Sequence, residues 1–135
     1  MVMLFDEFHL PENVYDVIFA TEQQAIVAKL LINEMKKNGN MMGKTEMSVF
    51  ANALHEGVNV EITKPGPVVR RERTKISYNK RQFYDRILTP MKGMGMIDYD
   101  LYKKQYLISD KFQKDLIRIG LMWNKEIQKQ NLSAN

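Results

Sequence analysis

The sequence predicts a single domain of the α+β class in which helices predominate over strands. A chain of 135 residues is long enough for one sizeable core but hardly for two. Most segments repeat apolar residues every three or four positions, as amphipathic helices do, whereas residues 94–109 alternate apolar and polar residues, as strands do. The most informative stretch is 77–109, where a charged helical pattern ends at a glycine-containing turn and a strand hairpin follows.

Composition excludes several classes of protein and site. The chain has no cysteine and only two histidines, His9 and His55, which are isolated, so we expect no disulfide, no metal site and no cofactor. No apolar run approaches the roughly 18 residues of a membrane-spanning helix. No basic leader precedes the apolar residues of the N-terminus. These observations predict a cytoplasmic protein.

The net charge of +4 is unevenly distributed along the chain. Residues 61–81 contain seven lysines and arginines but two glutamates, so this segment holds most of the positive charge. In contrast, five carboxylates precede the first cation, Lys29. Such an asymmetry is typical of a protein with one side facing a polyanion, although a basic run can also be an ordinary solvated surface.

Residues 1–20 are expected to form an N-terminal arm or a short helix that begins near Pro11. Thr21 and Gln24 then match a capping box, in which the threonine hydroxyl accepts from an early backbone amide of the helix. The helix that follows has apolar residues at helical spacing and is expected to end at Gly39.

A second helix is predicted for residues 44–56, where Met47, Phe50 and Leu54 recur at helical spacing and Gly57 is a natural stop. Methionine is flexible and fills irregular gaps in cores. The methionines expected to do so are Met41, Met42, Met47, Met91, Met94 and Met96.

Residues 58–76 form a basic excursion between the second and third helices. Its first half alternates apolar residues, and its tip contains Pro65 and Pro67. Prolines cannot donate the hydrogen bonds of a strand ladder. The pattern therefore predicts either an extended hairpin or a mobile loop.

A third helix is predicted for residues 77–93, with Ser77 or Asn79 as its N-cap. Pro90 lacks a backbone N–H and should bend the last turn. The buried stripe is expected to run through Tyr84, Leu88 and Met91, with Phe83 and Ile87 beside it. The opposite, exposed face carries Arg81, Gln82, Asp85 and Arg86.

The C-terminal part is expected to hold a hairpin, 94–109, and a long helix, 110–130, followed by a frayed tail, 131–135. The tip of the hairpin carries Tyr102, Lys103 and Lys104. The helix has an apolar stripe with spacings of four, three, four and four residues, made up of Phe112, Leu116, Ile119, Trp123 and Ile127.

A pattern runs from the third helix to the last one: Leu88-x-x-Met91-x-x-x-Gly95-Met-Ile97, an alternating strand, a basic turn and Tyr106-Leu-Ile-Ser-Asp110. On these residues, the region 21–123 resembles the winged helix-turn-helix DNA-binding domains of small bacterial and archaeal transcription regulators. The resemblance implies a DNA-binding domain over 21–109, with 77–93 as recognition helix and 94–109 as wing. The excursion 58–76 departs from the compact pattern of that family.

The resemblance also implies which residues contact DNA. The third helix would enter the major groove, where Arg81 and Arg86 could donate to guanine. There Gln82 could pair with an adenine edge, and Asp85 could accept from cytosine or orient an arginine. The excursion and the wing would contact phosphates or the minor groove. The remaining expected contacts are Arg70, Arg71, Arg73, Lys75, Asn79, Lys80, Tyr102, Lys103 and Lys104.

The terminal helix admits two interpretations. Its apolar stripe could pack back on the domain, or it could pair two copies of the chain, as winged-helix regulators often do through such an element. We expect a homodimer that reads two half-sites about one helical turn of DNA apart.

The sequence contains no phosphate loop, metalloprotease helix or nucleophile elbow, so we expect no enzyme activity. The expected function is sequence-specific binding of double-stranded DNA by a transcription regulator, with no evident small-molecule effector. The alternative is a winged-helix protein-interaction module in a replication, chromatin or mobile-element assembly. DNA binding that weakens steeply with salt would distinguish the first function from the second.

Overall fold

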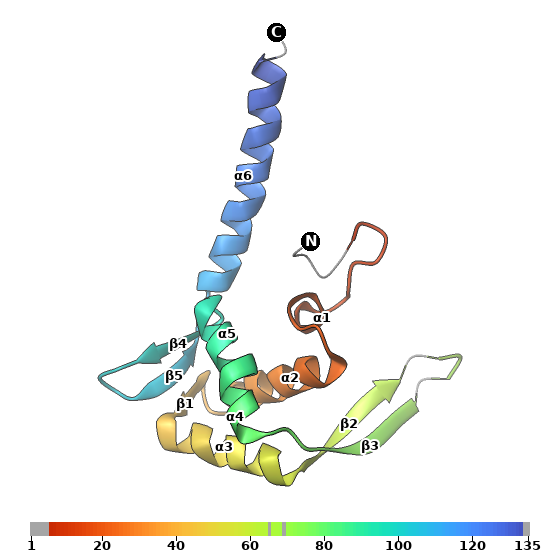
Figure 1. The fold of residues 1–135 in the computed structure, drawn as a ribbon, viewed down its shortest axis with the longest axis vertical. Helices are drawn as coiled ribbons and strands as arrows, with labels where there is room; N and C mark the ends of the chain where they lie inside the picture. The colour runs from red at the N-terminus through yellow and green to blue at the C-terminus, as the bar shows by residue number, and fades with distance from the viewer. Residues whose placement is uncertain (1–5, 65, 69, 134–135) are drawn as a thin grey trace.

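The computed structural model describes residues 6–64, 66–68 and 70–133 (Figure 1). The structure is of the α+β class, and helices predominate. The helices are α1 (Val14–Ile18), α2 (Glu22–Lys37), α3 (Lys44–Glu56), α4 (Lys80–Phe83), the π-helical segment η1 (Tyr84–Leu88), α5 (Thr89–Gly93) and α6 (Lys111–Ser133). The strands are β1 (Met41–Gly43), β2 (Val58–Lys64), β3 (Arg70–Ile76), β4 (Ile97–Asp100) and β5 (Gln105–Ile108).

The N-terminal region contains a short helix, but this helix starts later than the sequence indicates. α1 does not begin near Pro11, because the side chain of Asn13 accepts a hydrogen bond from the backbone N–H of Asp16 and caps the helix there. The predicted cap of α2 is confirmed: the hydroxyl of Thr21 accepts from the N–H of Gln24 at 3.1 Å. A stretch of non-helical backbone therefore separates α1 from α2.

Two antiparallel sheets accompany the helices. The larger sheet has the strand order β1-β5-β4, and the β2–β3 hairpin forms the second. The hairpin resolves the alternatives predicted for residues 58–76, since seven residue pairs join β2 and β3 along their whole length. The sequence does not predict β1, because three residues are too few to show an alternating pattern. Its Met42 lies opposite Tyr106 on β5.

One hydrophobic core joins α2, α3, the three-stranded sheet and residues 80–93. The prediction that methionines fill this core is confirmed in most cases. Met94 is half-buried and Met41 is 38% exposed. The largest fully buried side chains include Leu31, Met35, Met42, Met47, Leu54, Phe83, Ile87, Met91 and Ile97.

α4, η1 and α5 form one continuous helix, residues 80–93, which we refer to as the third helix. Of the two expected caps, Asn79 is the one used: its side chain accepts from the N–H of Gln82. Residues 77–79 therefore precede the helix, although the sequence pattern includes them in it. Ser77 instead donates its hydroxyl to the carbonyl of His55 on α3 at 3.0 Å.

A π turn lies in the third helix just before Pro90. The N–H of Thr89 donates to the carbonyl of Tyr84, five residues earlier. Proline cannot donate to the carbonyl four residues before it and crowds that carbonyl, so a wider turn accommodates it without ending the helix. The sequence predicts that Pro90 bends the last turn of the helix; the structure instead accommodates Pro90 by a wider turn at Tyr84–Leu88. The buried stripe shifts with it: Tyr84 is half-buried, and the buried residues are Phe83, Ile87, Leu88 and Met91.

The β4–β5 hairpin begins later than predicted. After the third helix, the chain turns through Gly95, and the N–H of Met96 donates to the carbonyl of Met91. β4 then starts at Ile97, three residues after the predicted start. Gly95 has a φ of +80°, and a Cβ there would lie 3.0 Å from Cβ of Lys111. Glycine therefore permits the turn and the close approach of α6.

α6 extends away from the rest of the molecule (Figure 1). It continues to Ser133, so residues 131–133, expected in a frayed tail, are helical, and 134–135 lie outside the described residues. Within the predicted apolar stripe, Phe112 alone packs on the core. The exposed members are Leu116 (50%), Ile119 (58%), Trp123 (66%) and Ile127 (42%). The stripe therefore does not pack back on the body of the protein.

In the part of the chain that the structure describes, no helix is both long enough and apolar enough to cross a membrane.

Candidate nucleic-acid interface

Hydrogen bonds from α2 and α3 fix the start of the third helix. The backbone N–H of Lys80 donates to Nδ1 of His55 at 3.2 Å. Gln23 on α2 donates through Nε2 to the carbonyl oxygen of Ser77 at 2.9 Å. The sequence gives no role to His55, and the structure uses it as an acceptor at this junction. These contacts set the orientation of the first turn of the third helix.

The outward face of the third helix is exposed to solvent, as the sequence predicts. Nε of Arg81 lies 3.8 Å from Oδ2 of Asp85, and these side chains are 91% and 66% exposed. Such a loose, solvent-exposed pair contributes little to stability and leaves the guanidinium donors available to a ligand. The four exposed residues of this face are Arg81, Gln82, Asp85 and Arg86.

Two residues expected to contact DNA are engaged within the protein. Oδ1 of Asn79 accepts from the backbone N–H of Gln82 at 3.1 Å and so caps the third helix. Lys80 is half-buried, and its Nζ lies 3.4 Å from Oγ of Ser48 on α3. Both side chains therefore help to attach the helix to the body, a role that spacing along the sequence does not distinguish from ligand contact.

The β2–β3 hairpin divides its cations between two faces. Because successive side chains of a strand point to opposite faces, Arg71, Arg73 and Lys75 share one face and Arg70 lies on the other. We refer to Arg71, Arg73 and Lys75 as the cationic face, and all three side chains are exposed.

The opposite face of the hairpin attaches it to the core. Val60 and Ile76 on this face are buried, with 8% and 7% of their surface exposed. On the cationic face, Glu61 is the cross-strand partner of Arg73, so one carboxylate lies among three cations. The hairpin is therefore anchored near its base and carries net positive charge on its free face.

The tip of the β4–β5 hairpin is ordered by an aspartate. Oδ1 of Asp100 accepts from the backbone N–H of Tyr102 at 2.9 Å and of Lys103 at 3.2 Å. Lys104 has a φ of +53° and its carbonyl accepts from the N–H of Lys44 at the start of α3. Tyr102 is 99% exposed. The tip thus presents an aromatic ring and two lysines to solvent from a fixed turn.

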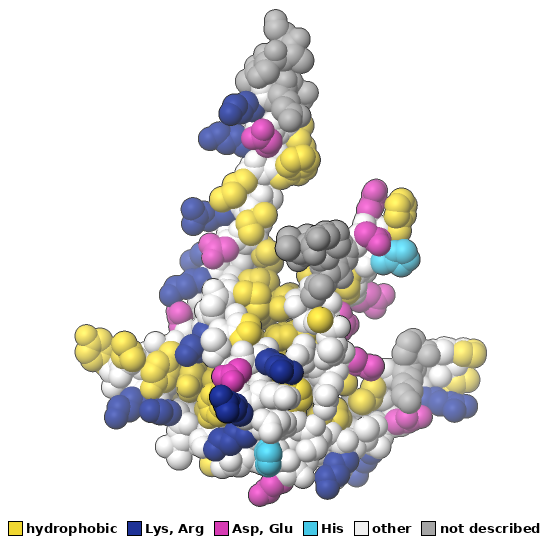
Figure 2. All heavy atoms as spheres, in the orientation of Figure 1, with side chains coloured by type: hydrophobic (Ala, Val, Ile, Leu, Met, Phe, Trp, Pro, Cys, Tyr) yellow, Lys and Arg dark blue, Asp and Glu magenta, His cyan; other side chains and the backbone are white. Residues whose placement is uncertain are grey.

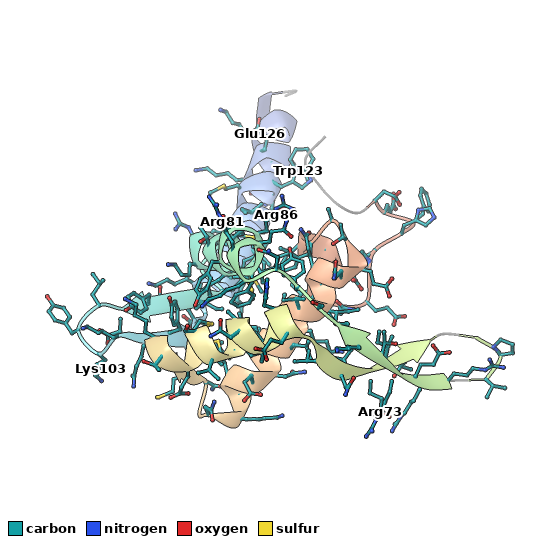
Figure 3. The ribbon with its side chains drawn as sticks, turned by 60° about the horizontal axis from the view of Figure 1, so that its bottom comes forward. Arg73, Arg81, Arg86, Lys103, Trp123 and Glu126 are labelled. Carbon is teal, nitrogen blue, oxygen red and sulfur yellow. The ribbon has the colours of Figure 1, made fainter. Side chains whose placement is uncertain are left out.

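The structure separates the cations of the third helix and of the two hairpins more than the sequence suggests. Figure 2 shows cations over the third helix in the centre, at the β4–β5 hairpin on the left and at the β2–β3 hairpin on the right. In Figure 3, Arg81 and Arg86 lie on the upper side of the molecule beside α6, whereas Arg73 points down from its hairpin. The cationic face and the third helix therefore face different sides of the protein.

Burial favours the neutral form of two tyrosines, Tyr84 on the third helix and Tyr106 on β5. Burial raises the pKa of Tyr84, although a hydrogen bond with Ser48 lowers it in part. Burial also raises the pKa of Tyr106, and the neighbouring tyrosines Tyr84 and Tyr99 add to this effect. Neither hydroxyl places a negative charge behind the candidate interface at neutral pH.

A large groove lies elsewhere, between α2, α3 and β2. Its volume is about 870 Å³, and its walls include Leu30, Phe50 and Val60. Val49, which also lines the groove, is 63% exposed. No sequence signal points to this groove, because its walls come from several elements that are separated along the chain.

Among the described residues, no three histidines, aspartates or glutamates are grouped as a metal site would require. Comparison of the chain with protein-family models, with curated proteins and with solved structures gave no match.

Proposed function

We propose that the body of this protein is a winged helix-turn-helix and that it binds double-stranded DNA sequence-specifically, as a transcription regulator does. In this proposal α2, α3 and the third helix are the three helices of the unit, and the β4–β5 hairpin is the wing. The order of elements supports it, since a strand hairpin follows the third helix directly and β1 completes its sheet.

The observation that carries the proposal is the two-sided third helix. One side packs into the core, while the other side exposes two arginines, a glutamine and an aspartate. Arginine and glutamine can form paired hydrogen bonds with guanine and adenine in the major groove. A helix whose orientation is fixed by buried contacts can hold such groups in register with the bases.

The two hairpins would supply contacts that do not depend on sequence. Lys103, Lys104 and Tyr102 at the wing tip suit phosphate or minor-groove contact. The cationic face points to another side of the body than the third helix does. It would therefore contact the phosphate backbone of DNA that flanks the bases read by the third helix. In this proposal the protein is a homodimer, and the apolar stripes of the two α6 helices form the contact between the copies.

The experiment is to select bound sequences from random duplex DNA, then to titrate the best one by fluorescence anisotropy at several salt concentrations. We expect Arg81→Ala/Arg86→Ala to abolish preference for the selected sequence, because both guanidinium groups lie on the proposed reading face. Arg118→Ala removes the same kind of side chain from α6 and should leave binding unchanged. If no duplex is bound at low salt, the proposal is wrong.

The alternative is a protein-interaction module built on the same fold. The groove between α2, α3 and β2 favours this alternative, since its apolar walls suit a protein segment better than a polyanion. The module would be supported if the chain bound a partner protein with an affinity that does not change with salt concentration and bound no DNA duplex.

A further inference from the structure

The apolar stripe of α6 needs a partner. Four of its five side chains are between 42% and 66% exposed, and α6 extends away from the body (Figures 1 and 2). An amphipathic helix gains most of its stability from packing its apolar face, which α6 alone does not do. A second copy of the same helix offers an apolar face of equal length.

The spacing of the stripe fits an antiparallel partner. From Phe112 to Trp123 the stripe residues are four, three and four positions apart, and this order reads the same in both directions. In an antiparallel pair, Phe112 of one copy therefore lies opposite Trp123 of the other, and Leu116 lies opposite Ile119. Each large ring then meets its partner at one end of the contact, and the aliphatic residues meet in the middle.

An apolar hollow at the base of α6 extends the same register. This hollow, of about 380 Å³, is lined by residues that include Tyr15, Met96, Ile108 and Phe112. In the register that places Phe112 opposite Trp123, Ile127 of the second copy lies four residues, about 6 Å, beyond Phe112 toward the body. The stripe thus has one more apolar residue at its far end, and the body has an apolar hollow where that residue arrives.

Charge also favours the antiparallel direction. Glu126 follows Trp123 on the edge of the stripe, and a parallel pair would bring Glu126 close to its own copy. In the antiparallel register the two Glu126 side chains instead lie about 25 Å apart along the common axis, because each is 17 residues from the level of the other. The antiparallel direction therefore avoids the repulsion between like charges that a parallel pair would have.

We propose that two copies of this chain pair through α6 in an antiparallel arrangement, with Phe112 packed on Trp123 and Ile127 seated in the hollow at the base of the other helix. This inference rests on the pairing through α6 in the proposed function and adds its direction, register and receiving site. The starts of the two α6 helices lie about 20 Å apart along the common axis, from a rise of 1.5 Å per residue. The two bodies lie at opposite ends of the pair.

The chain has no cysteine, so introduced pairs report directly on the arrangement. Asp115→Cys/Met122→Cys places two thiols on the same edge of the stripe, where the antiparallel register brings residue 115 of one copy beside residue 122 of the other. Within one chain these positions are roughly 10 Å apart along the helix, too far for a disulfide. Asp115→Cys/Gly120→Cys is the matched control, because a parallel pair brings residue 115 beside residue 120 of the other copy.

Light scattering first measures the mass of both variants at micromolar concentration. The variants are then oxidised mildly, and gel electrophoresis without reductant separates cross-linked from uncross-linked chains. We expect a dimer by light scattering, with most of the 115/122 variant cross-linked and most of the 115/120 variant not. Cross-linking of the 115/120 variant instead shows a parallel pair and overturns this inference while leaving the dimer intact. A monomer with no cross-link in either variant overturns the pairing itself, and duplex binding by that monomer would leave the proposed DNA-binding function standing.

Discussion

The third helix and the β2–β3 hairpin both expose arginines, but the body supports them differently. The third helix buries one whole side in the core, whereas β3 exposes every residue from Arg70 to Lys75 and attaches through Ile76 at its base. Arginines on a supported helix have defined positions and can discriminate base edges. Arginines on an exposed ribbon can meet phosphates from many positions. The same residue type thus suits specificity in one region and general attraction in the other.

The largest expected effect tests the difference in support. Ile87→Ala removes a fully buried side chain from beneath the third helix and should lower the free energy of unfolding by about 2–5 kcal/mol. Arg73→Ala changes an exposed side chain on the hairpin and should alter the free energy of unfolding by less than about 0.5 kcal/mol. Urea denaturation followed by circular dichroism measures both. Equal losses would show that the hairpin is as integral to the core as the helix.

The next effect tests whether the cationic face contacts DNA at all. Arg71→Ala/Arg73→Ala/Lys75→Ala should weaken binding to every duplex, on the order of 100-fold at about 0.1 M salt, because three phosphate contacts are lost. The slope of log affinity against log salt concentration should decrease by about 3. Fluorescence anisotropy at several salt concentrations gives both quantities. An unchanged slope would assign all DNA contact to the side that carries Arg81 and Arg86.

A smaller and more selective effect is expected on the third helix. Arg86→Ala should cost about 1–3 kcal/mol of binding to the selected sequence, and little on unrelated duplexes, because it removes one base contact. Arg86→Lys keeps the charge but loses the paired geometry, so it should retain general binding and lose the preference. Competition with duplexes changed at single positions identifies the base pair concerned. A uniform loss across all sequences would place Arg86 on the phosphate backbone instead.

Most of the fold is predictable from local pattern. The cap at Thr21, the stop at Gly57 and the alternation of β2 are each local signals, and the structure confirms all three. The errors have two sources. β1 exists because a distant strand, β5, pairs with it. The π turn before Pro90 is instead a local irregularity of the third helix, which a regular helical spacing does not show.

In the candidate site, too, features set by local pattern are predictable from the sequence, and features set by tertiary packing are not. Exposure of Arg81 and Arg86 follows from the apolar side of their own helix, so the sequence predicts it correctly. The engagement of Lys80 with Ser48 depends on how α3 packs beside the third helix. The separation of Arg73 from Arg81 depends on the direction in which the hairpin leaves the core, which no residue spacing encodes.

The smallest expected effect concerns the tyrosines packed beside the third helix, which have no counterpart on the cationic face. Burial raises the pKa of Tyr106 in the folded state, so the stability that it contributes is complete below the unfolded value of about 10 and is lost as pH rises through the folded value. Tyr106→Phe should therefore make the melting temperature fall less steeply above about pH 10. Tyr102→Phe changes a tyrosine that is 99% exposed and should leave the alkaline curve as it is in the unmodified protein. Melting curves between neutral and alkaline pH compare the three proteins, and coincident curves for all of them would show that ionisation of Tyr106 is not coupled to unfolding.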